Sequence, residues 1–245
     1  MPEGPSIVIL REQAADFSGR RVLRVEGNSR LDLQRMRGRT VQRLCSWGKH
    51  FLIVFPGFAM RVHFMLFGSY RIDERREAAP RMSLGFAGGR ELNFYACSLK
   101  YIEGDLDAVY DWSGDVMAEA WDPAAARRKL RAQPQTLACD ALLDQNVFAG
   151  AGNIIKNEVL HRIRVHPEST VGALPARKLG ELVTQAREYS FDFYAWKKAY
   201  VLRKHYQVHT KAHCPRDGTR LSYRAKLGRA QRRAFFCERC QRLYT

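Results

Sequence analysis

The spacing of apolar and polar positions changes twice along the chain. Residues 7–17 carry apolar side chains at helical spacing, and Ser18-Gly19 ends that pattern. From about residue 22 to residue 111, short apolar runs are separated by Gly, Asn, Pro and Arg. Such runs predict the strands of an antiparallel β-sandwich or barrel.

The second half of the chain has helical periodicity. Asp122 followed by Pro123 predicts a helix start, because Asp caps helices and proline suits the first helical position. Helical spacing also covers residues 136–145, 151–163 and 173–204. We therefore expect a helical region between the strands and the C-terminal tail.

With 245 residues, the chain is long enough to bury a sizeable core. The pattern predicts an α+β multidomain fold with three parts. These are an N-terminal β-sandwich domain (1–115), a helical domain (116–205) and a small cysteine-bearing hairpin (206–245). Because no apolar run approaches the roughly 20 residues of a membrane span and the N-terminus lacks a secretory pattern, we expect a cytoplasmic or nucleoid-associated protein without a membrane partner.

Positive charge is concentrated at the C-terminal end. Residues 196–245 contain 14 Lys and Arg side chains and two acidic ones, so +12 of the formal net charge of +16 lies there. Phe, Tyr and Trp are interleaved with these cations. This composition favours a nucleic-acid partner over an anionic membrane surface, since no membrane-type amphipathic helix accompanies it.

The cysteines fall into two groups. Cys45, Cys97 and Cys139 are isolated and are predicted to be buried thiols. In the tail, Cys237-x-x-Cys240 has the spacing with which two thiolates bind one tetrahedral metal ion. Zn²⁺ in a structural role is the ion that this spacing favours.

The rest of the metal site departs from a complete zinc ribbon, which has two cysteine pairs. Cys214 lies upstream, and Asp217 occupies the expected position of the fourth thiolate. A carboxylate can bind zinc, but His213 or His209 could also supply the last ligand. A metal-free hairpin is the alternative, although a tail with so little apolar content needs a staple to fold.

A glycine-rich turn precedes one of the expected helices. Gly150-Ala151-Gly152-Asn153 would place backbone N–H groups at a helix N-terminus, where a phosphate can bind, and the Asn153 amide adds a donor. Any tight turn between helices can use glycine, so a structural turn is the alternative to a phosphate site.

Several stretches together resemble the formamidopyrimidine-DNA glycosylase and endonuclease VIII family of base-excision repair enzymes. They are "PEGP" at the N-terminus, "WGKHFLIV", "VHFMLFGSYR", "DQNVFAGAGN" and the Cys-x-x-Cys pair after "RRAFF", in the order of the family and over essentially the whole chain. The resemblance implies a helix-two-turn-helix domain, a zinc-finger hairpin, and a monomer that binds damaged double-stranded DNA. It also implies a bifunctional DNA glycosylase and apurinic/apyrimidinic (AP) lyase.

The resemblance assigns roles to five residues. Pro2 would be the nucleophile, Glu3 its acid/base partner, and Lys49 a catalytic and phosphate contact. Asn153 and Arg232 would bind phosphates. A Met-Pro start is usually trimmed, and a chain-terminal amine with a pKa of about 7.7–8.0 has a neutral fraction that can attack a sugar.

The family fills the space left by an extruded base with side chains on a β loop. Met65, Leu66 and Phe67 match that position and could support the unstacked duplex. The alternative is a buried strand, because Val62, Phe64 and Leu66 alternate.

Three departures from the patterns of the family concern the substrate, and the first two are departures from its purine-specific branch. Residues 96–104 lack the Arg-Arg-Phe segment of the purine-specific branch, and the distance from Asn153 to Cys214 leaves little room for its long base-capping loop. Both favour the endonuclease VIII-like branch and oxidised pyrimidines. Ser6 stands where the family usually has glutamate, which puts the usual lesion preference in question.

Two other functions compete with a repair glycosylase. A catalytically silent relative could bind damaged DNA, although it would not need Pro2, Glu3 and Lys49. A zinc-ribbon RNA-binding protein would explain the tail but not the first 150 residues.

Overall fold

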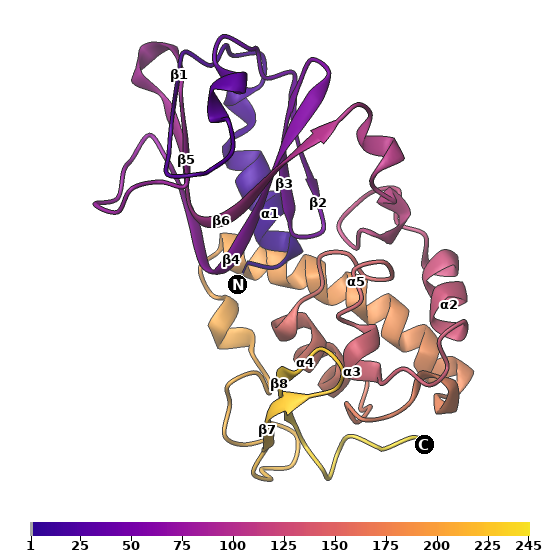
Figure 1. Cartoon of the computed structure of the whole chain (residues 1–245). Helices are drawn as coiled ribbons and strands as arrows, with labels where there is room; N and C mark the ends of the chain where they lie inside the picture. The colour runs from indigo at the N-terminus through magenta and orange to yellow at the C-terminus, as the bar shows by residue number, and fades with distance from the viewer. Residues whose placement is uncertain (1) are drawn as a thin grey trace. The chain divides into compact units, whose positions relative to one another are not determined.

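The computed structural model describes residues 2–245 and forms two compact units (Figure 1). The first extends to Tyr110, and the second covers Asp111–Thr245. The predicted removal of Met1 concerns a residue outside the described range. Within residues 2–245, no helix has both the length and the apolar character needed to cross a membrane.

The first unit combines one helix with an antiparallel sheet. Its strands follow the order β1-β5-β6-β4-β3-β2. Helix α1 packs against β2 and β3 and buries Ile7 and Leu10 in the core of this unit. The predicted antiparallel β architecture is confirmed, and the strands form a single six-stranded sheet. The elements are α1 (Gly4–Gln13), β1 (Arg24–Glu26), β2 (Arg43–Trp47), β3 (His50–Phe55), β4 (Phe58–Ile72), β5 (Met82–Gly85) and β6 (Glu91–Glu103).

A bulge interrupts the pairing of the two longest strands. Phe64 of β4 pairs with Cys97 of β6, but the next pair is Ser69 with Tyr95. Residues 65–68 are therefore opposite Ala96 alone. Extra residues that have no partner in the ladder are pushed out of a strand and bend it.

The second unit is helical and ends in a two-stranded hairpin. Asp122 caps α2 as predicted, since its carboxylate accepts the backbone N–H groups of Ala124 and Ala125 at 2.8 and 3.0 Å. We call the hairpin and the loops that precede and follow it, residues 206–245, the finger. The elements are α2 (Pro123–Arg131), α3 (Ala138–Ala141), α4 (Asn153–Arg162), α5 (Ala176–Lys198), β7 (Ser222–Leu227) and β8 (Arg232–Phe236).

Two of the expected helices are shorter than their patterns. The apolar pattern of residues 136–145 contains only the single turn of α3, and α5 stops at Lys198 rather than Lys204. Tyr200 adopts a positive φ of 60°, which ends a right-handed helix. The 3₁₀ segments are Ala15–Phe17, Leu33–Met36, Ala87–Gly89, Leu106–Ala108, Trp112–Gly114, Val171–Ala173 and Leu202–His205.

The isolated cysteines are free thiols. Cys97 and Cys139 are buried as predicted, and burial raises the pKa of each to about 12. The prediction is wrong for Cys45, which is only partly buried because it lies on β2 at the edge of the sheet.

Candidate functional site

The start of α1 holds Pro2 and Glu3. Glu3 is the N-cap residue, its carbonyl oxygen accepts the backbone N–H of Ser6 at 2.8 Å, and only 3% of its surface is exposed. Pro5 in the first turn of α1 favours helical geometry directly after this cap. The backbone of Glu3 is thus fixed by the helix, and Pro2 directly precedes this buried acidic residue in the chain.

Lys49 lies in a tight hairpin turn. Trp47, the last residue of β2, pairs with His50, the first residue of β3, so Gly48 and Lys49 form the turn between the two strands. Gly48 has a positive φ of 52°, which glycine adopts without strain. The predicted position of Lys49 in the first β hairpin is confirmed, and its catalytic role stays a prediction.

A group of aromatic rings adjoins this turn. His50 and His63 are opposite each other on β3 and β4, and their ring centroids are 5.1 Å apart. Trp47 packs against Tyr110 at 4.9 Å, and His50 Nδ1 lies 3.2 Å from the Tyr110 hydroxyl. Sequence reasoning missed this group, because its members meet only through the strand register and through the path of the chain from β6 to Tyr110.

Electrostatics keep the two imidazoles of this group neutral. Burial, with the positive charges of Arg61 and Lys49, lowers the pKa of His50 to about 3 and also lowers that of His63. Among the described residues, His63 Nε2 and Arg61 Nε are buried without a hydrogen-bond partner. The positive charge here therefore resides on Lys49 and Arg61.

The bulge of β4 exposes three large apolar side chains. Met65, Leu66 and Phe67 are 58%, 55% and 83% exposed, whereas Phe64 is buried. A β-carbon at Gly68 would lie 2.8 Å from the carbonyl oxygen of Ala96, so only glycine fits. The alternative of a buried strand is wrong beyond Phe64, because the bulge turns the next residues outward.

The glycine-rich turn leads into α4 at the predicted place. Gly150 has a positive φ of 101°, Gly152 is the N-cap, and Asn153 is the first helical residue. The Gln145 side chain holds the turn by accepting the N–H of Gly150 and donating to the carbonyl of Ala151, both at 3.1 Å. Asn153 Oδ1 is buried and has no hydrogen-bond partner among residues 2–245.

Polar side chains of α4 attach the finger to the helical core. Lys156 Nζ donates to the carbonyl of Arg233 at 2.8 Å, and the Glu158 carboxylate accepts the backbone N–H groups of residues 207–209 at 2.7–3.0 Å. Lys156 and Glu158 are each 1% exposed, so these bonds offset the cost of burying charge. Sequence reasoning missed both residues, because the groups that they bind lie about 50 to 77 positions further along the chain.

Asp140 of α3 holds the tip of the β7–β8 hairpin. Its two carboxylate oxygens accept the backbone N–H groups of Arg229 and Ala230 at 2.7 and 3.0 Å. Any β-carbon at Gly228 would lie 2.5 Å from this carboxylate. Arg232, the first residue of β8, is exposed and follows directly after this fixed turn.

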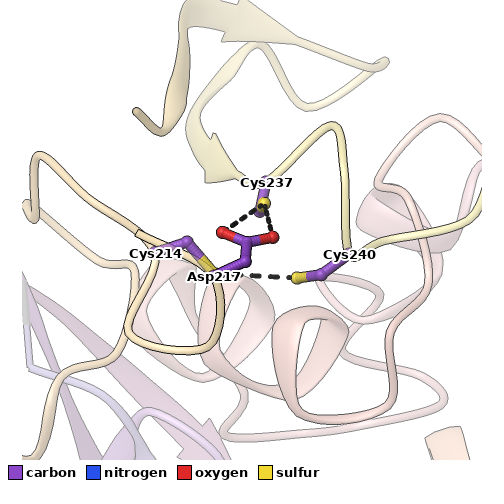
Figure 2. A group of neighbouring side chains, drawn as sticks. All are labelled: Cys214, Asp217, Cys237 and Cys240. Carbon is purple, nitrogen blue, oxygen red and sulfur yellow. Dashed lines mark hydrogen bonds between the residues drawn. The ribbon is translucent and has the colours of Figure 1, made fainter. Parts of the chain in front are cut away.

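Four side chains of the finger form a group that could hold a metal ion. They are Cys214 and Asp217 from one loop and Cys237 and Cys240 from another, and their ligand atoms all lie within 4.8 Å of one another (Figure 2). Cys214 Sγ is 3.7 Å from Cys240 Sγ, and Cys237 Sγ is 3.4 Å from Asp217 Oδ2. Three sulfurs and one carboxylate oxygen are a donor set suited to tetrahedral zinc.

The surroundings favour Asp217 over either histidine as the fourth donor. A hydrogen bond from the backbone N–H of Thr219 lowers the pKa of Asp217 to about 2, so its carboxylate is ionised. His209 is buried with Nδ1 at 2.9 Å from Asn157 Nδ2, and His213 is exposed; neither belongs to the group.

Among known proteins, two models of one family match this chain. The formamidopyrimidine-DNA glycosylase N-terminal domain matches residues 1–97, and the H2TH domain of the same family matches residues 113–189. Fold and site together define a helix-two-turn-helix protein with an N-terminal β-sheet unit and a C-terminal finger. The chain belongs to the formamidopyrimidine-DNA glycosylase and endonuclease VIII family, in its endonuclease VIII-like branch.

Similar curated proteins are longer than this chain. Endonuclease 8-like 3 of Xenopus laevis is 30% identical over 240 residues, which cover 90% of this chain and 38% of that protein. Endonuclease 8-like 2 of Homo sapiens is 33% identical over 199 residues, which cover 74% of this chain and 57% of that protein. The chain thus spans less than two thirds of the length of these relatives.

Solved structures share the fold over nearly the whole chain. A Lactococcus lactis formamidopyrimidine-DNA glycosylase bound to DNA with an AP site has a TM-score of 0.86 at 23% identity, covering 98% of this chain and 99% of that one. A viral DNA glycosylase has a TM-score of 0.84 at 17% identity, covering 98% and 100%. The predicted fold class is therefore confirmed.

Proposed function

We propose that the protein is a bifunctional DNA glycosylase and AP lyase of base excision repair, which binds damaged double-stranded DNA as a monomer and favours oxidised pyrimidines. The observation that carries the proposal is the start of α1, where Pro2 precedes the buried Glu3 in a chain of this family. The names of the relatives, endonuclease 8-like 2 and 3, support the same assignment.

In the proposed reaction, Pro2 supplies the nucleophile. Once Met1 is removed, the neutral Pro2 nitrogen attacks C1′ of the damaged nucleotide, the bond from C1′ to the base breaks, and the base leaves with a proton. Loss of the nitrogen's own proton and opening of the sugar ring give a cationic iminium. The iminium acidifies C2′, so loss of a proton there breaks the C3′–O bond, and a second elimination breaks the C5′–O bond.

Glu3 moves the protons of this reaction. Glu3 is buried and directly follows Pro2, and its carboxyl group is assigned to protonate the sugar ring oxygen or the leaving base. DNA phosphates are assigned to Lys49, Asn153 and Arg232. The exposed apolar bulge of β4 is assigned to fill the space that the extruded base leaves in the duplex.

Trapping with borohydride on DNA that contains an AP site tests the nucleophile. The wild-type protein should form a covalent adduct, and Pro2→Gly or an N-terminal tag should abolish it. Mass spectrometry of the mature N-terminus provides the control, because the mechanism requires a chain that begins at Pro2. Retained DNA binding without an adduct would instead indicate a silent damaged-DNA-binding relative.

Glu3→Gln separates the two activities. Base excision should be lost, while strand cleavage at a preformed AP site should largely persist, because that step starts after the base has left. Equal loss of both activities would contradict the role of Glu3.

We also propose Zn²⁺ as the ion of the four-residue group in the finger. Cys214, Asp217, Cys237 and Cys240 would hold it, and it would staple two loops that share only a small apolar cluster. The purified protein should contain one zinc per chain by metal analysis. Asp217→Cys should keep the metal and Asp217→Ala should lose it with a lowered unfolding temperature; wild-type protein without zinc would refute the proposal.

A further inference from the structure

Tyr200 stands out among the exposed side chains of the second unit. It lies just after α5, in the segment that leads to the finger, and 93% of its surface is exposed. Within residues 2–245, the structure shows no hydrogen bond, ring contact or ion pair of its side chain. The ring therefore contributes nothing visible to the packing of this protein.

The backbone at Tyr200 has the conformation of a glycine helix cap. Tyr200 N–H donates to the carbonyl of Lys197 at 3.1 Å, and Val201 N–H donates to that of Trp196 at 2.9 Å. This pair of bonds defines a Schellman motif, whose left-handed residue is usually glycine. A tyrosine at a φ of 60° costs free energy that glycine avoids.

The turn that carries Tyr200 is fixed at both ends. Trp196 of α5 and His205 stack with ring centroids 4.2 Å apart and an interplanar angle of 1°. Trp196 also packs edge-on against the buried Tyr189, which ties this stack to the core. Tyr200 is thus presented on a rigid turn, so little entropy is lost when its ring meets a ligand.

The chemistry around Tyr200 is that of a polyanion site. Lys197, Lys198, Arg203 and Lys204 are exposed within four residues of the ring, and residues 193–216 contain no Asp or Glu. An aromatic face between cations is how proteins bind unpaired nucleotides, since the base stacks on the ring while the cations bind phosphates.

We propose that Tyr200 is a stacking platform for an unpaired base of DNA, with Lys197, Arg203 and Lys204 as phosphate contacts. This inference rests on the proposed action on DNA and adds a binding residue that neither the family motifs nor the sequence pattern singles out. A side chain kept at a cost in folding and without an internal contact is explained by an external ligand.

Three substitutions of Tyr200 separate stacking from structure, with a short fluorescein-labelled oligothymidylate and its fully paired duplex as probes. Tyr200→Phe should bind the single strand within about two-fold of wild type, whereas Tyr200→Leu should bind it at least about five-fold more weakly. Tyr200→Gly should weaken binding equally while raising the unfolding temperature, because glycine relieves the strained cap. If Tyr200 had only a structural role, Tyr200→Gly would not combine weaker binding of the single strand with a higher unfolding temperature.

Phe191→Leu is the matched control, because Phe191 is an exposed aromatic residue of α5, the helix before Tyr200, and its ring already contacts Arg187. It should leave affinity for both probes unchanged. Wild-type affinity of Tyr200→Leu and Tyr200→Gly for the single strand would overturn the inference, and so would a Tyr200-dependent affinity for anionic phosphatidylserine vesicles without an effect on the oligonucleotide. If the wild type binds the probes and the Tyr200 variants bind them with the same affinity, the inference about Tyr200 fails and the glycosylase proposal still stands. If the wild type binds no DNA, both proposals fail.

Discussion

Single residues near Lys49 show how burial sets charge in the first unit. His50 touches Tyr110 and His63, and Arg61 and Lys49 add positive charge around it. Both effects disfavour the imidazolium, so the folded protein keeps His50 neutral at a pH where an exposed histidine is half protonated. Because His50 is neutral, it adds no positive charge that would repel the Lys49 ammonium group.

The pKa of His50 predicts a loss of stability in acid. Because folding lowers this pKa from 6.5 to about 3, the unfolded chain binds an extra proton between these values and the free energy of unfolding falls as the pH falls. The loss begins as the pH falls below about 6.5, and the free energy of unfolding then falls by at most about 1.4 kcal/mol per pH unit. Urea denaturation at several pH values should show a shallower acid loss for His50→Gln. Identical pH profiles for the two proteins would contradict the prediction.

Gly68 determines whether the apolar bulge can form. A methyl group there would lie 2.7 Å from Phe64 Cβ and 2.8 Å from the Ala96 oxygen, so Gly68→Ala should destabilise the protein by about 1–3 kcal/mol. Gly180→Ala is the control, because Gly180 lies in α5 with open space around its Cα and alanine should stabilise the helix by about 0.5–1 kcal/mol. Urea denaturation of both variants and the wild type measures these changes in the free energy of unfolding. A Gly68→Ala variant as stable as the wild type would show that the bulge tolerates a β-carbon.

At the scale of elements, the finger is a hairpin that depends on its neighbours. Its own apolar cluster contains only Val208, Cys214, Leu221 and Cys237 as buried members. Its attachment to the helical core is partly apolar, through Leu227 and Tyr244, and partly polar, through Asp140 of α3 and Lys156 and Glu158 of α4. The position of Arg232 is therefore set by helices that precede it by many residues.

Asp140 gives a direct test of this attachment. Asp140→Ala removes both acceptors of the hairpin tip, so the amides of Arg229 and Ala230 should exchange hydrogen faster and DNA affinity should fall less than in Arg232→Ala. Hydrogen exchange with mass spectrometry, combined with DNA titration, measures both effects. Asp16→Ala is the control, because Asp16 is an exposed acidic residue of the first unit. Asp144→Ala would not serve, because the Asp144 side chain accepts the N–H of Asn146 close to the glycine-rich turn. Unchanged exchange at the tip in Asp140→Ala would refute the attachment.

At the scale of the whole molecule, the charge is unevenly distributed. The last 50 residues carry +12 of a net +16, whereas the preceding residues are close to balanced and hold many of their cations in ion pairs. Association with DNA should therefore depend steeply on salt, with the C-terminal part dominating the slope.

Arg232→Ala should reduce that slope by about one phosphate and weaken binding to any duplex. Titrations at several salt concentrations measure the slope of log affinity against log salt. Arg177→Ala is the control, since Arg177 is an exposed cation that pairs with Glu181 at 3.1 Å. An unchanged slope in Arg232→Ala would show that this arginine does not contact a phosphate.

Local signals in the sequence determined much of this protein. The Asp122-Pro123 start of α2, the glycine-rich turn before Asn153 and the cysteine spacing of the finger each follow from short-range geometry, and the structure confirms each of these positions. Caps, turns and paired ligands involve residues a few positions apart, so their chemistry can be read without the fold.

Only the tertiary structure decided the contacts between distant residues. The register of β3 and β4 brings His50 to His63, the bulge turns Phe67 outward against its apolar pattern, and Asp140 reaches Arg229 across 89 positions. It also placed Asp217, and not His209 or His213, in one group with the three cysteines of the finger. Such contacts depend on strand register and helix packing, which arise from the sum of many weak long-range interactions that no local pattern encodes.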